Sequence, residues 1–443
     1  MSFEYEELPV FSEAIMPPVV RGTADLTEFA YQGHGYDSLI DRIGQSHGDV
    51  AARMYDTAIA CQLAFRRAEG LNSQDEALER SQVFRVGGNT TRPDKPSRNA
   101  PLRLLALAGP GDLMVNTPLD FLTNTLDVRL DLLYLLPDRP LPPALPDHDV
   151  AFFALGEADA PTLQRLRRLF DSWPRPTLNN PKFLPALGRD TLARSLAGVA
   201  GICSPTAVAV TRTEVEAHLH TGRPILGFDP ARGLYPCLIR PASSHAGIGL
   251  ARMETRAELA DYLRLSFERN FFITAFEDYR SPDGLYRKSR IAFIDRQPFL
   301  CHMAISQHWM VHYLNAGMTD CAEKRGQEAR AMAEFDEGFA RRHAAAFSEL
   351  HQRLSFDYYS IDCAETRDGQ LLVFEADTAA IIHLMDPPDM FPYKPPQMRR
   401  VFTAFDEMLR KRACVAGMAA QDVNDPAFRR SIPPPAALHL SSR

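Results

Sequence analysis

The sequence predicts a multidomain protein of mixed α/β and α+β architecture, and three observations support this. A chain of 443 residues is long enough for about three domains of ordinary size. Apolar residues make up 45% of it and charged residues 24%, which is the composition of a globular protein. Short apolar runs alternate with helical patterns after residue 100, whereas the preceding residues show a helical pattern alone.

Charge, hydropathy and cysteine content exclude several classes of partner. The formal charge is −7, so no basic excess favours nucleic-acid binding. No apolar stretch approaches the length of a membrane span, and the acidic start lacks the features of a secretory signal. The seven scattered cysteines form no C-x-x-C pair, which favours a reducing cytoplasm. We expect a cytoplasmic protein with no nucleic-acid or membrane partner, and the sequence allows a homo-oligomer.

Residues 1–98 are predicted to be a helical N-terminal segment that ends in a linker. Apolar and small residues recur at helical spacing over 36–68, which predicts two or three helices, and 86–99 has the composition of a linker. Residues 99–175 then predict a small parallel α/β domain. Its expected strands are 102–108, 130–136 and 149–155, its helices are 118–125 and 162–173, and its proline-rich loop is 138–146.

The rest of the chain continues to alternate between strands and helices. We expect helices over 190–196, 256–265, 325–354 and 398–412, and strands over 207–210, 237–241, 271–276, 286–294, 298–305, 358–365 and 371–377. An Asp-Gly turn joins the last two strands into a hairpin. The proline-rich end, from about residue 431, is expected to be a disordered tail.

The strongest chemical signal is a set of three carboxylates on this last hairpin. Glu375 and Asp377 are two residues apart on one strand, so they point to one face. Pairing across the turn can bring Asp362 onto the same face. Three such carboxylates repel one another unless a cation lies among them, and they suit Mg²⁺ completed by nucleotide phosphates. The alternative is a group of solvated acids on an edge hairpin, which the apolar flanking residues disfavour.

A basic residue and a small-residue loop form the second signal. Arg240 ends an apolar strand and precedes a loop that contains Ser243, Ser244, Gly247 and Gly249. Small residues let backbone N–H groups approach a polyphosphate, and a guanidinium binds phosphate oxygens bidentately. The loop matches neither G-x-G-x-x-G nor the P-loop, so it is a weak signal on its own.

The third signal is an apolar strand that passes into an acidic stretch, residues 271–279, which is suited to stack on adenine and hydrogen-bond a ribose. Lys288, one of only six lysines, shares a strand face with Arg290. The alternative is a solvent-facing basic pair. His308 and His312 have the spacing of a helical zinc pair, but no glutamate follows His308, so we favour pocket-lining or ordinary histidines.

Taken in order, these residues resemble the ATP-grasp superfamily, especially its RimK-like carboxylate–amine ligase branch. The resemblance covers residues 176–412. It is carried by Leu178-Asn-Asn-Pro, Gly188-Arg-Asp, Pro205-Thr206, Arg240 with its loop, the hinge from Thr274 to Glu277, Arg290, Asn315 and Asp362…Glu375-x-Asp377. It implies a pre-ATP-grasp domain over 99–175, subdomains over 176–272 and 273–415 that hold ATP between them, and a flexible tail over 416–443.

The resemblance implies an ATP-dependent ligase that joins a carboxylate to an amine, on a small molecule or peptide, through an acylphosphate. ATP and Mg²⁺ are the implied cofactors. Nucleotide binding is implied for Arg240, Ser243, Ser244, Gly247, Gly249, Thr274, Phe276, Glu277 and Lys288, metal binding for Asp362, Glu375 and Asp377, and catalysis for Arg240, Lys288, Arg290 and Asn315.

The sequence departs from the family pattern at four positions. Arg240 and Thr191 stand where the family usually has lysine, Ala275 replaces a usual hinge glutamate, and Asp377 replaces a usual asparagine. The guanidinium of arginine can still bind phosphate through two parallel hydrogen bonds, whereas the ammonium of lysine acts as a single point charge. These departures keep two alternatives open: a degenerate nucleotide-binding regulatory or scaffold protein, and a phosphotransferase on the same fold.

Overall fold

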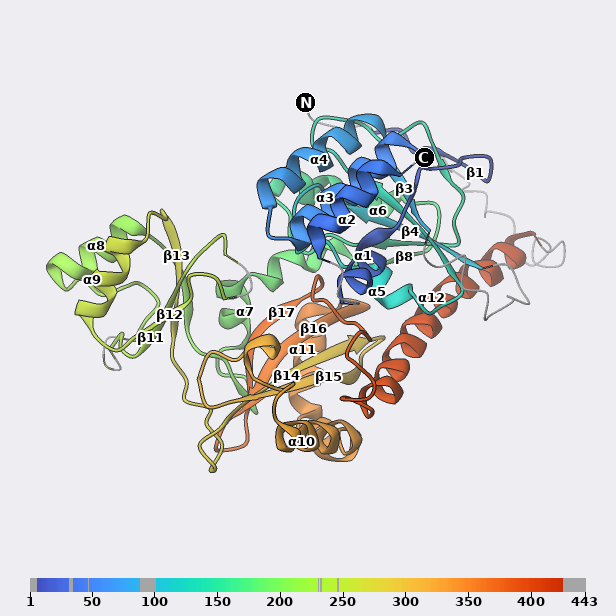
Figure 1. Ribbon diagram of the computed structural model, residues 1–443. Coiled ribbons are helices and arrows are strands. Elements are labelled where there is room, and N and C mark those ends of the chain that lie inside the picture. The colour runs from blue at the N-terminus through green and yellow to red at the C-terminus, as the bar shows by residue number, and fades with distance from the viewer. Residues whose placement is uncertain are drawn as a thin grey trace, which may run out of the picture.

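The computed structural model of the protein describes residues 6–31, 35–46, 48–87, 101–229, 231, 233–244 and 247–424, with side chains through residue 414. Within these residues the strands form sheets of six, five, four and two strands. Figure 1 shows a smaller lobe on the left that stands apart from a larger body built on the five- and six-stranded sheets. The predicted α/β and α+β fold class is confirmed.

The six-stranded sheet forms the first layer of the larger body. Its order is β2 (Val19–Val20), β3 (Val83–Val86), β5 (Val128–Tyr134), β4 (Leu102–Ala108), β7 (Val150–Phe153) and β8 (Thr177–Leu178). β5, β4, β7 and β8 are parallel, as predicted, whereas β3 is antiparallel to β5. The helices that follow β4 and β7 are α5 (Leu119–Thr123) and α6 (Ala160–Ser172).

The N-terminal residues are part of this sheet, which corrects the prediction of a separate helical segment. Helices α1 (Gly22–Tyr31), α2 (Tyr36–Gln45), α3 (Val50–Leu63) and α4 (Arg67–Arg80) are present, but β2 and β3 extend the sheet. Val86 ends β3, and most of the predicted linker lies outside the described residues. The predicted loop 138–146 is also wrong at its end, because β6 (Ala144–Pro146) pairs with β1 (Val10–Ser12).

The smaller lobe has its own sheet and its own core. Its antiparallel strands run in the order β10 (Ala207–Thr211), β13 (Asn270–Ala275), β11 (Cys237–Pro241) and β12 (Ala251–Met253), with α8 (Arg212–Thr221) and α9 (Arg256–Leu265). Thr211 and Glu214 form a capping box that starts α8, and Thr255 caps α9. Val215, Leu259 and Phe271 belong to a buried cluster confined to this lobe.

The five-stranded sheet runs in the order β15 (Gln297–Ser306), β14 (Tyr286–Ile294), β16 (Tyr358–Glu365), β17 (Leu371–Asp377) and β9 (Ile202–Cys203). The single helix predicted over 325–354 is wrong, because a π-helical turn, η3 (Asp336–Ala340), separates α10 (Ala322–Ala333) from α11 (Ala344–Leu354). Such a turn inserts one residue into the helical period. His343 follows it and its Nε2 lies 2.9 Å from Glu365 Oε2.

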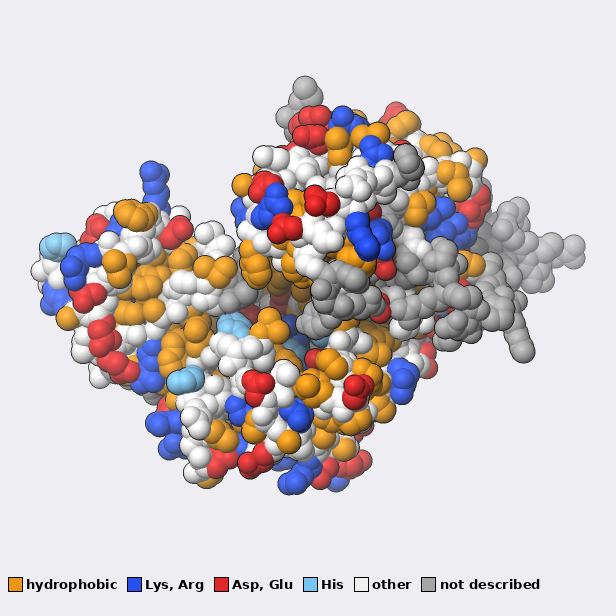
Figure 2. Space-filling view, in the orientation of Figure 1, with side chains coloured by type: hydrophobic (Ala, Val, Ile, Leu, Met, Phe, Trp, Pro, Cys, Tyr) orange, Lys and Arg blue, Asp and Glu red, His pale blue; other side chains and the backbone are white. Residues whose placement is uncertain are grey.

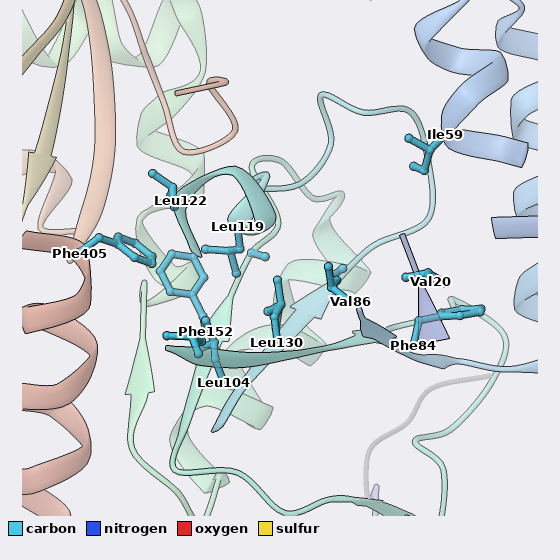
Figure 3. Packing of buried hydrophobic residues seen from close by; sticks show 14 of the residues in the cluster. Val20, Ile59, Phe84, Val86, Leu104, Leu119, Leu122, Leu130, Phe152 and Phe405 are labelled. Carbon is cyan, nitrogen blue, oxygen red and sulfur yellow. The ribbon is translucent and has the colours of Figure 1, made fainter. Parts of the chain in front are cut away.

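The last helix, α12 (Lys394–Asn424), joins the two large sheets. It begins before and ends after the predicted 398–412, so the predicted tail is wrong over 416–424, and its remainder lies outside the described residues. Phe405 packs against Phe152 of β7 and Tyr358 of β16, with ring centroids 6.1 and 5.5 Å away (Figure 3). No helix in the described part of the chain is long and apolar enough to cross a membrane.

Candidate active site

A cleft lies between the smaller lobe and the five-stranded sheet, where Figure 2 shows the lobe on the left separated from the rest by a concave surface. One wall comes from α7 (Arg189–Leu196), β10, β11, β13 and the residues after β13. The other wall comes from β14, β17 and residues 309–312. The charged side chains in the lining are Arg189, Arg240, Lys288, Glu277 and Glu375. Cations therefore outnumber carboxylates in a cleft whose remaining lining is largely apolar.

Arg240 is a buried cation that lacks a carboxylate partner. It is the second-to-last residue of β11, and it is 8% exposed. The guanidinium donates from Nε to Ser244 Oγ at 3.2 Å and from Nη2 to the Ser244 carbonyl, and it forms no ion pair within the described chain. Burial, with Arg189 nearby, lowers the pKa of Arg240 to about 10. A buried guanidinium without a counter-ion favours an anionic ligand.

Arg189, which the sequence analysis did not select as a site residue, lies near Arg240 on the same wall of the cleft. It begins α7, and its Nη2 lies 2.7 Å from Glu375 Oε2. The Gly188-Arg-Asp segment carried the only signal for it, as a basic residue at the start of a helix. Arg189 thus brings a second guanidinium to the same wall as Arg240 and neutralises Glu375 at the same time.

The hinge residues form the apolar end of the cleft. Thr274 lies near the end of β13, and Phe276 and Glu277 follow it. Phe276 N donates to Pro236 O at 3.2 Å, and its ring meets Trp309 edge-on at 6.0 Å. A flat apolar pocket of this kind, edged by backbone and by Glu277, suits a purine base with its ribose.

Two of the three predicted carboxylates of the hairpin, Asp362 and Glu375, are paired with cations. The sheet register places Arg290 opposite Asp362 and Asp362 opposite Glu375. Asp362 lies 2.7 Å from Lys288 Nζ, and Arg290 contacts both of its oxygens, at 2.8 and 3.1 Å. Burial by itself raises the pKa of Asp362, but Arg290 and Lys288 hold this pKa well below its usual value. Burial likewise raises the pKa of Glu375, but Arg189 together with Lys288 and Arg290 lowers this pKa below its usual value.

Asp377 differs from its two neighbours, because no cation of the described chain forms an ion pair with it. Its Oδ1 accepts a hydrogen bond from Ala379 N at 2.6 Å, and burial raises the pKa of Asp377 to about 6. No group of three or more His, Cys, Asp or Glu side chains in the described chain is placed to hold a metal ion. The predicted set of Asp362, Glu375 and Asp377 is therefore not a preformed three-carboxylate site.

The donor set nevertheless fits a Mg²⁺ ion that arrives with a nucleotide. Such an ion needs one or two carboxylates and takes its other ligands from phosphates and water. Glu375 and Asp377 are the better placed carboxylates, since Asp362 is held by both Lys288 and Arg290, whereas Glu375 pairs with Arg189 alone and Asp377 with no cation of the described chain. These two side chains are on one strand and flank the small Ala376.

The other predicted residues lie around the cleft at varying distance. Gly247 lines it, and its position leaves no room for a side chain beside His312. Ser243 and Gly249 are exposed and do not line the cleft. Asn315 is also exposed, and its Oδ1 accepts from His312 N at 2.9 Å, so the structure does not bring its side chain into the cleft. His312 lines the cleft, in agreement with the pocket-lining role favoured for it, whereas Trp309 and Phe374 also line the cleft and were not selected as site residues.

Comparisons with known proteins give structural similarity without sequence similarity. No known family and no curated protein matches the chain. A D-alanine–D-alanine ligase from Bacillus anthracis complexed with ATP aligns at 13% identity, over 71% of this chain and 98% of its own, with a TM-score of 0.41. A RimK-domain ATP-grasp protein from Sphaerobacter thermophilus aligns at 18%, over 70% and 99%, with 0.38. The D-Ala:D-Ser ligase VanG from Enterococcus faecalis gives 14%, 70%, 99% and 0.42.

The Sphaerobacter thermophilus protein is named for the superfamily that the sequence motifs resemble. At such identities and TM-scores these solved structures assign no role to any residue of this chain. The roles proposed below rest on the geometry of the cleft.

Proposed function

We propose that the protein is an ATP-dependent carboxylate–amine ligase that works through an acylphosphate. The observation that carries this proposal is the charge arrangement of the cleft. Arg189, Arg240 and Lys288 line the same cleft as Glu375, and an apolar pocket beside Phe276 lies in the same space. An apolar pocket that leads to several cations and a carboxylate fits a nucleotide whose base, phosphates and metal need those three environments.

In the first step a carboxylate oxygen of one substrate attacks the γ-phosphorus, the bond to the β-phosphate oxygen breaks, and ADP leaves. Arg240 and Arg189 would bind the phosphate oxygens and stabilise the charge that moves onto the leaving group. Glu375 and Asp377 would hold a Mg²⁺ ion, which would supply positive charge to the phosphates when bound. Asp362 would hold Lys288 and Arg290 in place on the opposite strand.

In the second step the amine nitrogen attacks the acyl carbon, inorganic phosphate leaves, and the nitrogen loses a proton. The acylphosphate must be kept from water during this interval. The apolar lining and the loop that carries Gly247, which packs beside His312, are suited to exclude water.

The test is a titration of the full-length protein with a non-hydrolysable ATP analogue, with and without Mg²⁺, followed by an assay of phosphate release. Mg²⁺-dependent binding that weakens in Asp377→Ala, with phosphate release that requires both a carboxylate and an amine, is the expected result. No binding at millimolar nucleotide contradicts the proposal.

One observation favours a second function, a nucleotide-binding regulatory protein with a degenerate site. Asp362 and Glu375 are already neutralised by cations, and two lysines usual in the family are replaced. Under this alternative the nucleotide binds but no acceptor-dependent phosphate is released. A phosphotransferase would instead leave the phosphoryl group on a stable product, which the same assay distinguishes.

A further inference from the structure

A cavity lies on the other face of the five-stranded sheet from the cleft, against α10 and the π-helical turn η3, and we call it the α10 cavity. Successive residues of a strand point to opposite faces. On β14, Lys288 therefore lines the cleft, whereas Arg287 and Ser289 line the α10 cavity. Figure 1 shows α10 beside β14 and β15, which form the wall opposite the helix. The volume is about 290 Å³, which is enough for a small organic molecule.

Ser289 is a buried polar side chain of this cavity that has no partner. It is 8% exposed, and its hydroxyl forms no hydrogen bond within the described residues. The residues opposite it in the sheet are Met303 on β15 and Cys363 on β16, which are weak hydrogen-bonding groups. A buried hydroxyl without a partner is costly unless a ligand or a water satisfies it. Ser289 therefore indicates an occupant that has a polar group.

The rest of the lining suits an apolar body. Phe335 and Phe339 stack with their ring centroids 6.1 Å apart, and Leu300 and Met303 of β15 face them across the cavity. Gly338, in η3, keeps this space open, since an added Cβ there would meet nothing nearer than Arg342 Nη1, at 3.8 Å. Single π-helical turns often occur at functional sites.

The carboxylates of the α10 cavity are less neutralised than its cations. Arg287 donates to both oxygens of Asp283, at 3.0 and 2.6 Å. Arg342 pairs with Glu365 Oε2 at 2.8 Å, but Glu365 Oε1 forms no ion pair or hydrogen bond in the part of the chain that the structure describes. Glu334, which is exposed, has no ion-pair partner there at all. Unpaired carboxylate oxygens beside aromatic rings favour a cationic ligand.

The α10 cavity shares one wall with the cleft, because Tyr279 lines both. Tyr279 is 5% exposed, and its hydroxyl donates to the Trp309 carbonyl at 2.7 Å. The ring of Trp309 meets Phe276 in the proposed base pocket, and the ring of Tyr279 meets Phe374 of the cleft at 5.1 Å. An occupant that packs on Tyr279 therefore contacts a residue that supports the nucleotide pocket.

We propose that the α10 cavity binds a small amine with an aromatic or aliphatic body, and that this amine is an effector of the cleft. Its ammonium group contacts Glu334, Glu365 and the hydroxyl of Ser289, and its body packs on Phe335 and Phe339. The amine lies outside the cleft, so it is not a reactant. Its binding is independent of the proposed ligase function, whereas its effect on nucleotide affinity rests on that function.

The first test is calorimetric titration of the full-length protein, without nucleotide, with phenethylamine and with phenylacetate, which has a similar body and the opposite charge. Phenethylamine is expected to bind the wild type and Glu337→Gln, a control that changes an exposed carboxylate of η3 outside the cavity. It is expected to bind Glu334→Gln about tenfold more weakly. No binding of phenethylamine, equal or tighter binding of phenylacetate, or equal binding of phenethylamine to Glu334→Gln overturns the proposal.

Gly338→Leu is the second variant, because it fills the cavity and leaves its charged side chains in place. Gly326→Leu is the control, since Gly326 is an exposed residue of α10 where an added Cβ also meets nothing within 4 Å. Loss of phenethylamine binding in a Gly338→Leu protein that melts like Gly326→Leu supports the site, and unchanged binding overturns it.

Nucleotide titration tests the effector role and separates it from the ligase function. Saturating phenethylamine is expected to change the dissociation constant of a non-hydrolysable ATP analogue by about fivefold or more in the wild type. Tyr279→Phe, which loses the hydrogen bond to Trp309, should show a smaller change. An unchanged constant in the wild type overturns the effector role. Phenethylamine binding without nucleotide binding contradicts the ligase function and keeps the amine site, whereas nucleotide binding without phenethylamine binding does the reverse.

Discussion

Asp362, beside the cleft, and Asp120, in the N-terminal cavity that α1, α3, α4 and the ends of β4 and β7 enclose, are both buried carboxylates, but their pKa values are shifted in opposite directions. Asp362 is 4% exposed, and Lys288 and Arg290 hold its pKa well below the usual value. Asp120 is 8% exposed, and burial without a cationic partner raises its pKa. Burial favours the neutral acid in both places, so the neighbouring cations decide the outcome. This difference indicates that the charged side chains around each cavity predict whether its ligand is an anion or a cation.

The largest effect on ATP turnover is expected when Glu375 loses its charge. Glu375→Gln keeps the shape of the side chain but removes a proposed metal ligand and the partner of Arg189. We expect ATP turnover to fall by about a thousandfold or more, with the melting temperature nearly unchanged, because phosphoryl transfer depends on the metal and its charge balance. A coupled ADP-release assay measures this, and near-normal turnover in a folded variant would refute the metal assignment.

Asp56, a second buried carboxylate near the N-terminal cavity, extends the comparison to the pH dependence of stability. Asp56 accepts from Arg21 N and Gly22 N, and Gly22 lines the cavity; burial raises the pKa of Asp56 to about 7. The folded state therefore keeps this proton while the unfolded state loses it above about pH 4. Its contribution to stability is fully present below that pH and is lost as the pH rises to about 7, by up to about 4 kcal/mol.

Asp56→Asn removes this titration. The variant is expected to gain stability relative to the wild type between pH 5 and pH 8, as measured by urea denaturation at both values. The exposed Asp75→Asn should leave the pH dependence as it is in the wild type. A parallel shift of wild type and Asp56→Asn with pH would contradict the assignment.

Removal of the unpaired cation in the cleft is expected to have a smaller effect. Arg240→Ala should raise the dissociation constant of a non-hydrolysable ATP analogue by about ten- to a hundredfold, since a charge-assisted contact contributes about 1.5–3 kcal/mol. Arg264→Ala, on the exposed face of α9, is the matched control. Calorimetry decides the point, and equal nucleotide affinity in Arg240→Ala would contradict a phosphate role.

The smallest expected effect concerns a single neutral hydrogen bond. Tyr134→Phe removes one hydroxyl from the Tyr55–Tyr134 pair and leaves the ring in place. We expect the free energy of unfolding, measured by urea denaturation, to fall by about 0.5–1.5 kcal/mol and nucleotide affinity to stay the same. Weaker nucleotide binding in this variant would mean that the Tyr55–Tyr134 pair is coupled to the cleft.

The elements that the sequence predicted best are short strands and helices bounded by clear turn or capping residues. The strands β14, β16 and β17 match the predicted ranges to the residue. The break at η3 was missed because a one-residue insertion leaves the helical period nearly unchanged. β3 was missed because its partner β5 lies about 45 residues further along, and such pairing has no local signal.

The cleft was predictable in part for a similar reason. Arg240, Thr274 and Lys288 stand on strands whose order could be inferred, and all three line the cleft. Which carboxylates would be neutralised could not be inferred, because this depends on the register that sets Arg290 beside Asp362. The residues that line the N-terminal cavity come from helices and strands spread over more than 350 positions, so no motif in the sequence marks this cavity.

The contact of Phe405 with both Phe152 and Tyr358 has a mechanical consequence. Helix α12 ties the six-stranded and five-stranded sheets into one rigid unit, since one buried ring packs against a strand of each. The smaller lobe shares no residue with that core and keeps its own cluster. We therefore expect the N-terminal cavity and β17 to move together as one rigid body. The smaller lobe, which bears Arg240, is expected to open and close against them.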